Sequence, residues 1–265
     1  MNGSDRLTQV AGDARSAGDD ERAQGLVTAA GRRIELAGLY NLRDVGGYPA
    51  AGGPIPWRTL LRSDALHRLD PEGIAGLAGL GLRLVVDLRT LVEAEIAPSP
   101  LDALNARHAH VSILGGDMQS LPLELDAIYA YVIEQCGPAV ADAIRPLGAA
   151  DAFPALVHCS AGKDRTGIVI AMVLAVLGVP DDVIAADYAL SGSYLDPEHT
   201  AAIGQLREGT GLGEQLTGEL LASPPQLILR ALAAARAGHG SVEGYLLAHG
   251  LETAELATLR AALAG

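Results

Sequence analysis

Cys159 and Arg165 are the side chains in this sequence best suited to chemistry on an anion, and five residues separate them. A thiolate is a strong nucleophile, and cationic side chains or a helix N-terminus favour it over the neutral thiol. An arginine presents a planar set of donors that can hold two phosphate oxygens at once, which a lysine cannot do. The pair therefore predicts attack by the cysteine on a phosphate ester while the arginine binds the phosphoryl group.

The residues around this pair suit the same chemistry. Gly162 permits a tight turn, Lys163 adds positive charge, and Thr166 carries a hydroxyl that can donate to the sulfur. His158 can hold the loop through hydrogen bonds from its ring. The backbone amides expected to surround a phosphate belong to Ser160, Ala161, Gly162, Lys163, Asp164 and Arg165. A buried cysteine that merely ends a strand would not require this combination.

The elements that must position this loop follow from the apolar pattern. Residues 155–157 form an apolar run typical of a buried strand. Residues 166–177 have the length and apolar density of a buried helix, which Gly178 and Pro180 end. A strand, a loop and a helix in this order direct backbone amides and the positive end of a helix dipole at one point, where an anion is favoured.

Ten residues that read HCSAGKDRTG, from His158 to Gly167, resemble the phosphate loop of cysteine-dependent phosphatases. The form of this motif is similar to that of a bacterial tyrosine-phosphatase-like family. Four further segments resemble the same family: NLRDVGG at residues 41–47, RSDAL at 62–66, DLRT at 87–90 and IAADYALS at 184–191. The resemblance therefore extends over five separate parts of the chain.

The resemblance implies hydrolysis of phosphate monoesters through a phosphocysteine intermediate, with no metal and no other cofactor. Protein phosphotyrosine is the first substrate class it implies, and dual specificity would add phosphoserine and phosphothreonine. Lipid-active members of the family extend the expectation to phosphoinositides, for which the positive charge of Lys163 is suited. The expected partner is therefore a phosphorylated protein or a phosphoinositide.

The sequence predicts an α/β fold. A single domain over residues 33–265 is expected to hold a central, mainly parallel sheet of four or five strands flanked by helices, after a flexible extension at residues 1–32 with room for a short helix. Further strands are expected at residues 57–61, 84–86 and 106–113. Helices are expected at residues 71–80, 121–136, 139–150, 181–190, 197–207, 212–222, 224–237, 242–248 and 253–263. In the family that the chain resembles, such C-terminal helices can cover the active site as a lid.

The general acid has two candidates. The Trp-Pro-Asp segment of many eukaryotic tyrosine phosphatases is missing, because the single Trp57 is followed by Arg58. Asp87 is the first choice, since it stands at the carboxyl end of a central strand, where ligands bind in open α/β sheets. Asp164, inside the phosphate loop, is the second choice, although its position also suits orienting Lys163.

Further arginines in the family-like segments are candidates for lining the site. They are Arg43, Arg62 and Arg89. A salt bridge to a neighbouring carboxylate explains Arg62 equally well, and Asp44 is expected to hold Arg43. Thr90 and Glu93 have the spacing of a capping box at the start of a helix.

Composition limits the partners and the compartment. The formal net charge of −13 makes nucleic acid a poor partner, since nucleic acid binding depends on basic contacts to phosphates. No apolar run is long enough to cross a bilayer, and the N-terminus lacks the basic and apolar regions of a signal peptide. We therefore expect a cytoplasmic protein, or one secreted without a recognisable signal. The oligomeric state is not encoded in any visible pattern.

Two other classes of protein use related features. A catalytically silent module that binds phosphate or phosphoinositides would not need both Cys159 and Arg165. A sulfurtransferase or arsenate reductase would use similar loop geometry, and a reductase would need a resolving cysteine close to the first. The second cysteine of this chain, Cys136, is distant in sequence. His108 and His110 have a spacing suited to metal ligands, but no third ligand accompanies them.

Overall fold

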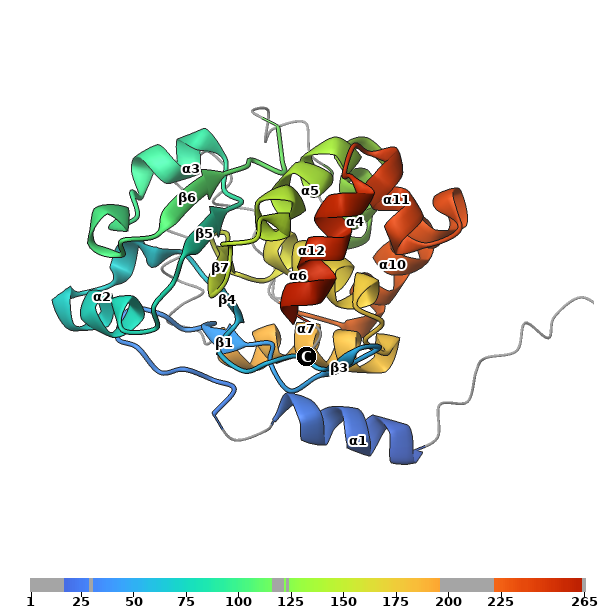
Figure 1. Ribbon diagram of the computed structural model, residues 1–265, viewed down its shortest axis with the longest axis horizontal. Coiled ribbons are helices and arrows are strands. Elements are labelled where there is room, and N and C mark those ends of the chain that lie inside the picture. Colours follow the sequence, from blue (N-terminus) through green and yellow to red (C-terminus); the bar gives the residue numbers. More distant parts are fainter. Residues whose placement is uncertain (1–16, 29–30, 116–121, 123, 196–221, 264–265) are drawn as a thin grey trace, which may run out of the picture.

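A computed structural model of the 265-residue chain describes residues 17–28, 31–115, 122, 124–195 and 222–263. These residues form a five-stranded sheet with helices on both faces (Figure 1). The strand order is β1 (Arg43–Asp44), β4 (Leu60–Ser63), β7 (Ala155–His158), β5 (Leu84–Asp87) and β6 (Arg107–His110). Among the described strands of this sheet, only β1 and β4 pair in antiparallel fashion, so the expected α/β fold with a mainly parallel sheet is confirmed.

The central strand β7 is the one that leads into the phosphate loop. Every residue of β4, β5 and β7 is buried, as expected for parallel strands covered on both faces. In register, Ser63 and Asp87 both lie beside His158, where the three strands end. The carboxyl ends of the central strands therefore bring three segments that are distant in sequence to one edge of the sheet.

Side chains alternate between two hydrophobic clusters, one on each face of the sheet. Leu61, Val85 and Leu156 pack in the smaller cluster, against the side of α2 (Pro71–Ala78). Their neighbours along the strands point into the larger cluster, which holds most of α6 (Asp164–Val176). Nearly all of α6 is buried, which explains why its apolar residues do not follow a one-sided helical pattern.

The helices of the larger face surround α6. Contacts to it come from α5 (Gly137–Ile144), α7 (Asp181–Tyr194), α10 (Pro225–His239) and α11 (Val242–Ala248), as Figure 1 shows. The remaining elements are α3 (Leu91–Ile96), α4 (Leu125–Gln135), α12 (Thr253–Leu263) and a small hairpin of β2 (Pro49–Ala50) and β3 (Gly53–Pro54). The helix expected at residues 197–207, and all but the last residue of the one expected at 212–222, lie outside the described residues.

Part of the N-terminal extension is a packed helix. This helix is α1 (Ala17–Val27), which packs against α7 (Figure 1). Ala23 and Val27 are buried in the main hydrophobic cluster, so part of the segment expected to be flexible belongs to the packed structure. Among the described residues, no helix has the length and apolar character needed to cross a bilayer.

Candidate active site

The phosphate loop places the sulfur of Cys159 beneath a backbone amide. Cys159 follows β7 and is buried, and the Gly162 N–H donates to its Sγ at 3.2 Å. Gly162 has a φ of +66°, and a Cβ there would clash with the backbone of Ser63. The turn that brings this amide to the sulfur therefore requires glycine.

Three loop amides, those of Ala161, Gly162 and Lys163, are oriented from outside, through the carbonyl groups of the same peptide units. Each of three successive carbonyls accepts a hydrogen bond from a neighbouring segment. The pairs are Ala65 N with Ser160 O (3.0 Å), Asn41 Nδ2 with Ala161 O (2.9 Å) and Arg62 Nη2 with Gly162 O (2.9 Å). Because N–H and C=O point in opposite directions in a trans peptide, the amides of the same peptide units point away from these donors. The family-like segments at residues 41–47 and 62–66 thus shape the loop.

A buried carboxylate on α7 fixes two of these segments. Asp187 accepts from Arg43 Nε at 3.1 Å, from Arg62 Nη1 at 2.6 Å and from the Tyr48 hydroxyl at 2.9 Å. Burial raises the pKa of Asp187, but the charges of Arg43 and Arg62 outweigh burial and hold that pKa well below its usual range. We call Asp187, Arg43, Arg62, Tyr48 and Asn41 the sealed network.

Asp44 does not hold Arg43, so that expectation is wrong. Its carboxylate accepts the backbone N–H groups of Gly46 and Arg58, both at 2.7 Å. Adjacent residues of a strand point to opposite sides, so Arg43 faces α7 while Asp44 faces the following turn. The partner of Arg43 is Asp187, which lies 144 residues further along the chain.

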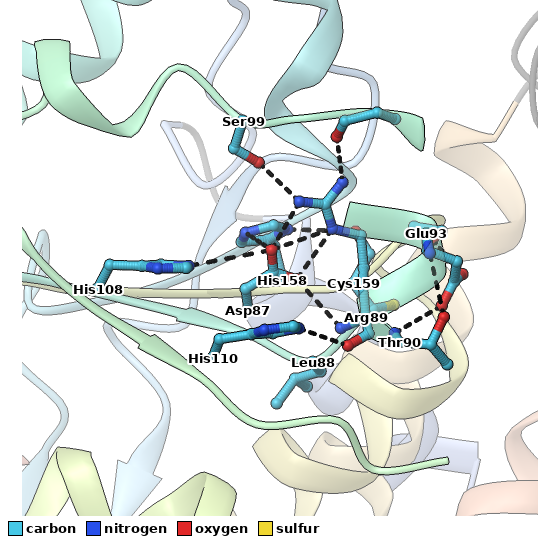
Figure 2. Close-up of polar contacts among 12 residues, drawn as sticks. Asp87, Leu88, Arg89, Thr90, Glu93, Ser99, His108, His110, His158 and Cys159 are labelled. Carbon is cyan, nitrogen blue, oxygen red and sulfur yellow. Dashed lines mark hydrogen bonds and ion pairs between the residues drawn. The ribbon is translucent and has the colours of Figure 1, made fainter. Parts of the chain in front are cut away.

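Arg165 is held by a carboxylate from α3. Its Nη1 and Nη2 donate to the two oxygens of Glu93 at 2.6 and 2.8 Å. Glu93 also accepts from the Ser160 hydroxyl at 2.6 Å, and it forms the expected capping box with Thr90 (Figure 2). Burial opposes the charge on Arg165, but Glu93 raises its pKa above the ordinary value, so the guanidinium stays charged. Arg165 Nε donates to no described residue and remains available to a ligand.

Asp87 forms a closed pair with Arg89 (Figure 2). The guanidinium bonds both carboxylate oxygens, at 2.9 Å to Oδ1 and 2.6 Å to Oδ2, and continues to Ala97 O and Ser99 Oγ. Burial alone would raise the pKa of Asp87. His158 and Arg89 lower that pKa by more than burial raises it, so it lies well below its usual range. This pair braces the turn between β5 and α3.

Two predicted loop residues, His158 and Thr166, are fully buried. The His158 ring donates from Nδ1 to Cys159 O at 3.2 Å, and burial, with the Arg89 charge adding to it, lowers its pKa to about 4 despite nearby Asp87. Thr166 Oγ1 is buried and has no hydrogen-bond partner within the described part of the chain. The expected bond from this hydroxyl to the sulfur is therefore not formed in this structure.

Asp164 stands in the first turn of α6 with a partly exposed side chain. Its Oδ1 accepts from the Tyr129 hydroxyl at 2.9 Å and lies 3.3 Å from Lys163 Nζ. Lys163 is buried, and its Nζ also donates to Ala222 O at 2.9 Å. The lysine thus links the loop to the point where the described chain resumes at residue 222.

The predicted residues divide into two groups. The loop itself brings together Cys159, Arg165, Lys163 and Asp164. The arginines proposed as lining residues, Arg43, Arg62 and Arg89, are at most 2% exposed and bond carboxylates and carbonyls. Arg62 bonds a loop carbonyl, and Arg43 and Arg89 brace neighbouring segments.

Sequence reasoning missed four residues of the site: Glu93 as the partner of Arg165, and Asp187, Tyr129 and Tyr188. For Glu93 the spacing with Thr90 was visible, but it pointed only to a helix cap.

Two histidines of β6 border the Asp87 pair. The His108 and His110 rings stack with centroids 6.2 Å apart, and His110 Nε2 bonds Arg89 O at 2.8 Å (Figure 2). Within the residues that the structure describes, no cluster of three or more metal-binding side chains is found. His110 holds the turn after β5 through the Arg89 carbonyl.

Comparison with known proteins places this site in a family. The model of the tyrosine phosphatase family matches residues 34–265. The chain is 32% identical to the triple specificity protein phosphatase PtpB of Mycobacterium tuberculosis, over 87% of this chain and 99% of that protein. It is 30% identical to a tyrosine-protein phosphatase of Nostoc commune, over 79% of this chain and 75% of that one. The chain belongs to the tyrosine phosphatase family and is a phosphatase.

Proposed function

We propose that this phosphatase hydrolyses phosphate monoesters in two steps, through a phosphocysteine intermediate on Cys159. The observation that carries the proposal is the loop itself: the Gly162 N–H donates to Sγ at 3.2 Å, and neighbouring carbonyls are bonded outward. Arg165 lies at the end of the same loop, and Glu93 fixes its plane. Such an array suits a tetrahedral dianion above the sulfur.

In the first step the Cys159 thiolate attacks phosphorus, an S–P bond forms, and the bond to the ester oxygen breaks. Loop amides and the Arg165 guanidinium stabilise the charge on the three equatorial oxygens. In the second step water attacks phosphorus, the S–P bond breaks, and inorganic phosphate and the thiolate are regenerated.

Asp164 is the general acid of this proposal, although the sequence ranks Asp87 first. Both oxygens of Asp87 are bonded to Arg89, it is 1% exposed, and its pKa is held below the usual range. Such a carboxylate neither takes up a proton readily nor reaches a substrate. Asp164 belongs to the loop, is 28% exposed in its side chain, and can protonate the leaving oxygen and then accept a proton from water.

Protein phosphotyrosine is the first substrate class of this proposal, with phosphoserine, phosphothreonine and phosphoinositides as further candidates. The relative from Mycobacterium tuberculosis carries the words triple specificity in its name, which supports a broad range. The sequence suggests that the positive charge of Lys163 suits phosphoinositides, but its position in the structure supports this less. Its ammonium is buried and bonded to Ala222 O, so its charge acts on the loop and on Asp164.

The test is a substrate panel of phosphotyrosine, phosphoserine and phosphothreonine peptides and phosphoinositides, with Cys159→Ser as the blank. Phosphate release from phosphotyrosine is expected to be fastest and to disappear in the blank. Trapping of a phosphorylated wild-type protein by acid quench would reveal the intermediate. Binding of phosphate without any release would favour the silent binding module, and release that persists in Cys159→Ser would rule out the cysteine mechanism.

A further inference from the structure

The two oxygens of the Asp164 carboxylate have different surroundings. Oδ1 accepts from the Tyr129 hydroxyl at 2.9 Å and lies 3.3 Å from Lys163 Nζ. Oδ2 accepts no hydrogen bond from any residue that the structure describes. The carboxylate therefore has one oxygen held by the protein and one without a protein donor. Its side chain is 28% exposed.

This asymmetry decides where a proton can reside. An oxygen that accepts from a hydroxyl and faces an ammonium group uses its lone pairs for those donors. A proton on Oδ1 would displace one of them, whereas a proton on Oδ2 disturbs neither. The protonated carboxyl therefore carries its hydrogen on Oδ2.

The hydroxyl of Tyr129 is itself directed by a second tyrosine. The Tyr129 and Tyr188 oxygens are 2.7 Å apart, and their rings meet edge to face. Tyr129 has one proton, which goes to Asp164, so the Tyr188 hydroxyl must donate to Tyr129. Burial and the nearby Asp164 charge raise the pKa of both tyrosines, which keeps them protonated donors at neutral pH.

We infer that Tyr129, supported by Tyr188, is a positioning residue that directs the proton of Asp164 to Oδ2, where the leaving oxygen can receive it. The inference rests on the proposed role of Asp164 as the acid. A poor leaving group needs this proton during cleavage, whereas a good leaving group departs with little help. Tyr129 should therefore matter in proportion to the basicity of the leaving oxygen.

The experiment compares kcat/KM for phenyl phosphate and p-nitrophenyl phosphate, two aryl esters that differ mainly in leaving-group basicity. Tyr129→Phe keeps the ring and removes the hydroxyl. Its kcat/KM for phenyl phosphate is expected to fall about 3- to 10-fold more than that for p-nitrophenyl phosphate, the effect of one lost hydrogen bond. Tyr188→Phe should show the same selectivity to a smaller extent. Tyr131→Phe, on the same helix α4, is the matched control and should change neither value.

Asp164→Asn separates this inference from the proposed acid. It should lower kcat/KM for phenyl phosphate by about 100-fold or more, with a smaller loss for p-nitrophenyl phosphate. Adding Tyr129→Phe to that variant should cause no further selective loss. If Asp164→Asn is selective but Tyr129→Phe lowers both substrates equally, the positioning role is overturned and the acid survives. If Asp164→Asn is not selective, the acid assignment fails and the role of Tyr129 falls with it.

Discussion

The two sides of the phosphate loop use the same chemistry, an arginine paired with a carboxylate, for different purposes. On the side of β1, β4 and α7, Asp187 binds Arg43 and Arg62, and all three side chains are at most 1% exposed. On the side of α3, Glu93 binds Arg165, and their side chains are 14% and 8% exposed. The first pairing shapes the backbone, and the second orients a guanidinium toward the ligand position.

The difference lies in exposure. In the sealed network, Arg62 continues to the Gly162 carbonyl and Arg43 to Ser191 Oγ. Arg62 Nε has no partner in the described part of the chain, but the whole side chain is buried. Arg165 Nε also donates to no described residue, while Glu93 bonds both of its Nη atoms. Exposure, rather than the presence of an arginine or of an unused donor, therefore distinguishes the proposed binding residue from the structural ones.

The largest expected effect is the loss of stability when the sealed network loses its carboxylate. Asp187→Asn leaves Arg43 and Arg62 buried without a full counter-charge, and the free energy of unfolding should fall by about 3 to 5 kcal/mol. Urea unfolding measures this loss. Asp181→Asn is the matched control on α7, because its pair with Arg236 is 37% exposed on both sides and should cost less than about 1 kcal/mol. Equal losses in the two variants would show that burial of the pair does not set the cost of removing its negative charge.

The next effect concerns His158, which lies against the equally sealed Asp87 and Arg89 pair. Its pKa is about 4 in the folded protein and 6.5 ordinarily, so the unfolded chain binds this proton first as the pH falls. The free energy of unfolding should therefore decrease between pH 6.5 and pH 4, by up to about 3 kcal/mol from this group. His158→Asn keeps a donor for Cys159 O but does not titrate.

Unfolding measured at several pH values in both proteins provides the check. His67, whose pKa is also lowered to about 4, contributes equally to each, so the difference between the two curves reports His158 and its coupling to Asp87. Parallel curves would show that the buried ring does not resist protonation.

The smallest expected effect on stability comes from the pair of Glu93 and Arg165 on the side of α3. Glu93→Gln removes the charge that orients Arg165, and kcat/KM should fall about 10- to 100-fold because a small misplacement of a binding group is costly. The free energy of unfolding should fall less than in Asp187→Asn. Glu95→Gln is the control, since Glu95 is exposed on the same helix. An unchanged kcat/KM would show that the loop orients Arg165 without Glu93.

Several parts of the fold could be predicted because their signals are local. The apolar runs at residues 84–86 and 155–157 became the buried strands β5 and β7. The loop from Cys159 to Arg165 was visible in residue types and spacing alone. The predicted helix at residues 139–150 instead starts at Gly137 and gives way to a 3-10 turn at Arg145–Gly148, because Pro146 cannot continue an α-helix.

The sequence by itself determined the family, the candidate nucleophile and the strand that leads to it, since these depend on neighbouring residues and on alternation along one segment. Only the tertiary structure decided which charges meet. Arg165 and Glu93 are 72 residues apart, and Arg62 and Asp187 are 125 apart. Such pairings follow from strand order and helix packing, which no local pattern records. An arginine in a family-like segment is therefore the proposed ligand group at Arg165 and a buried brace at Arg43, Arg62 and Arg89.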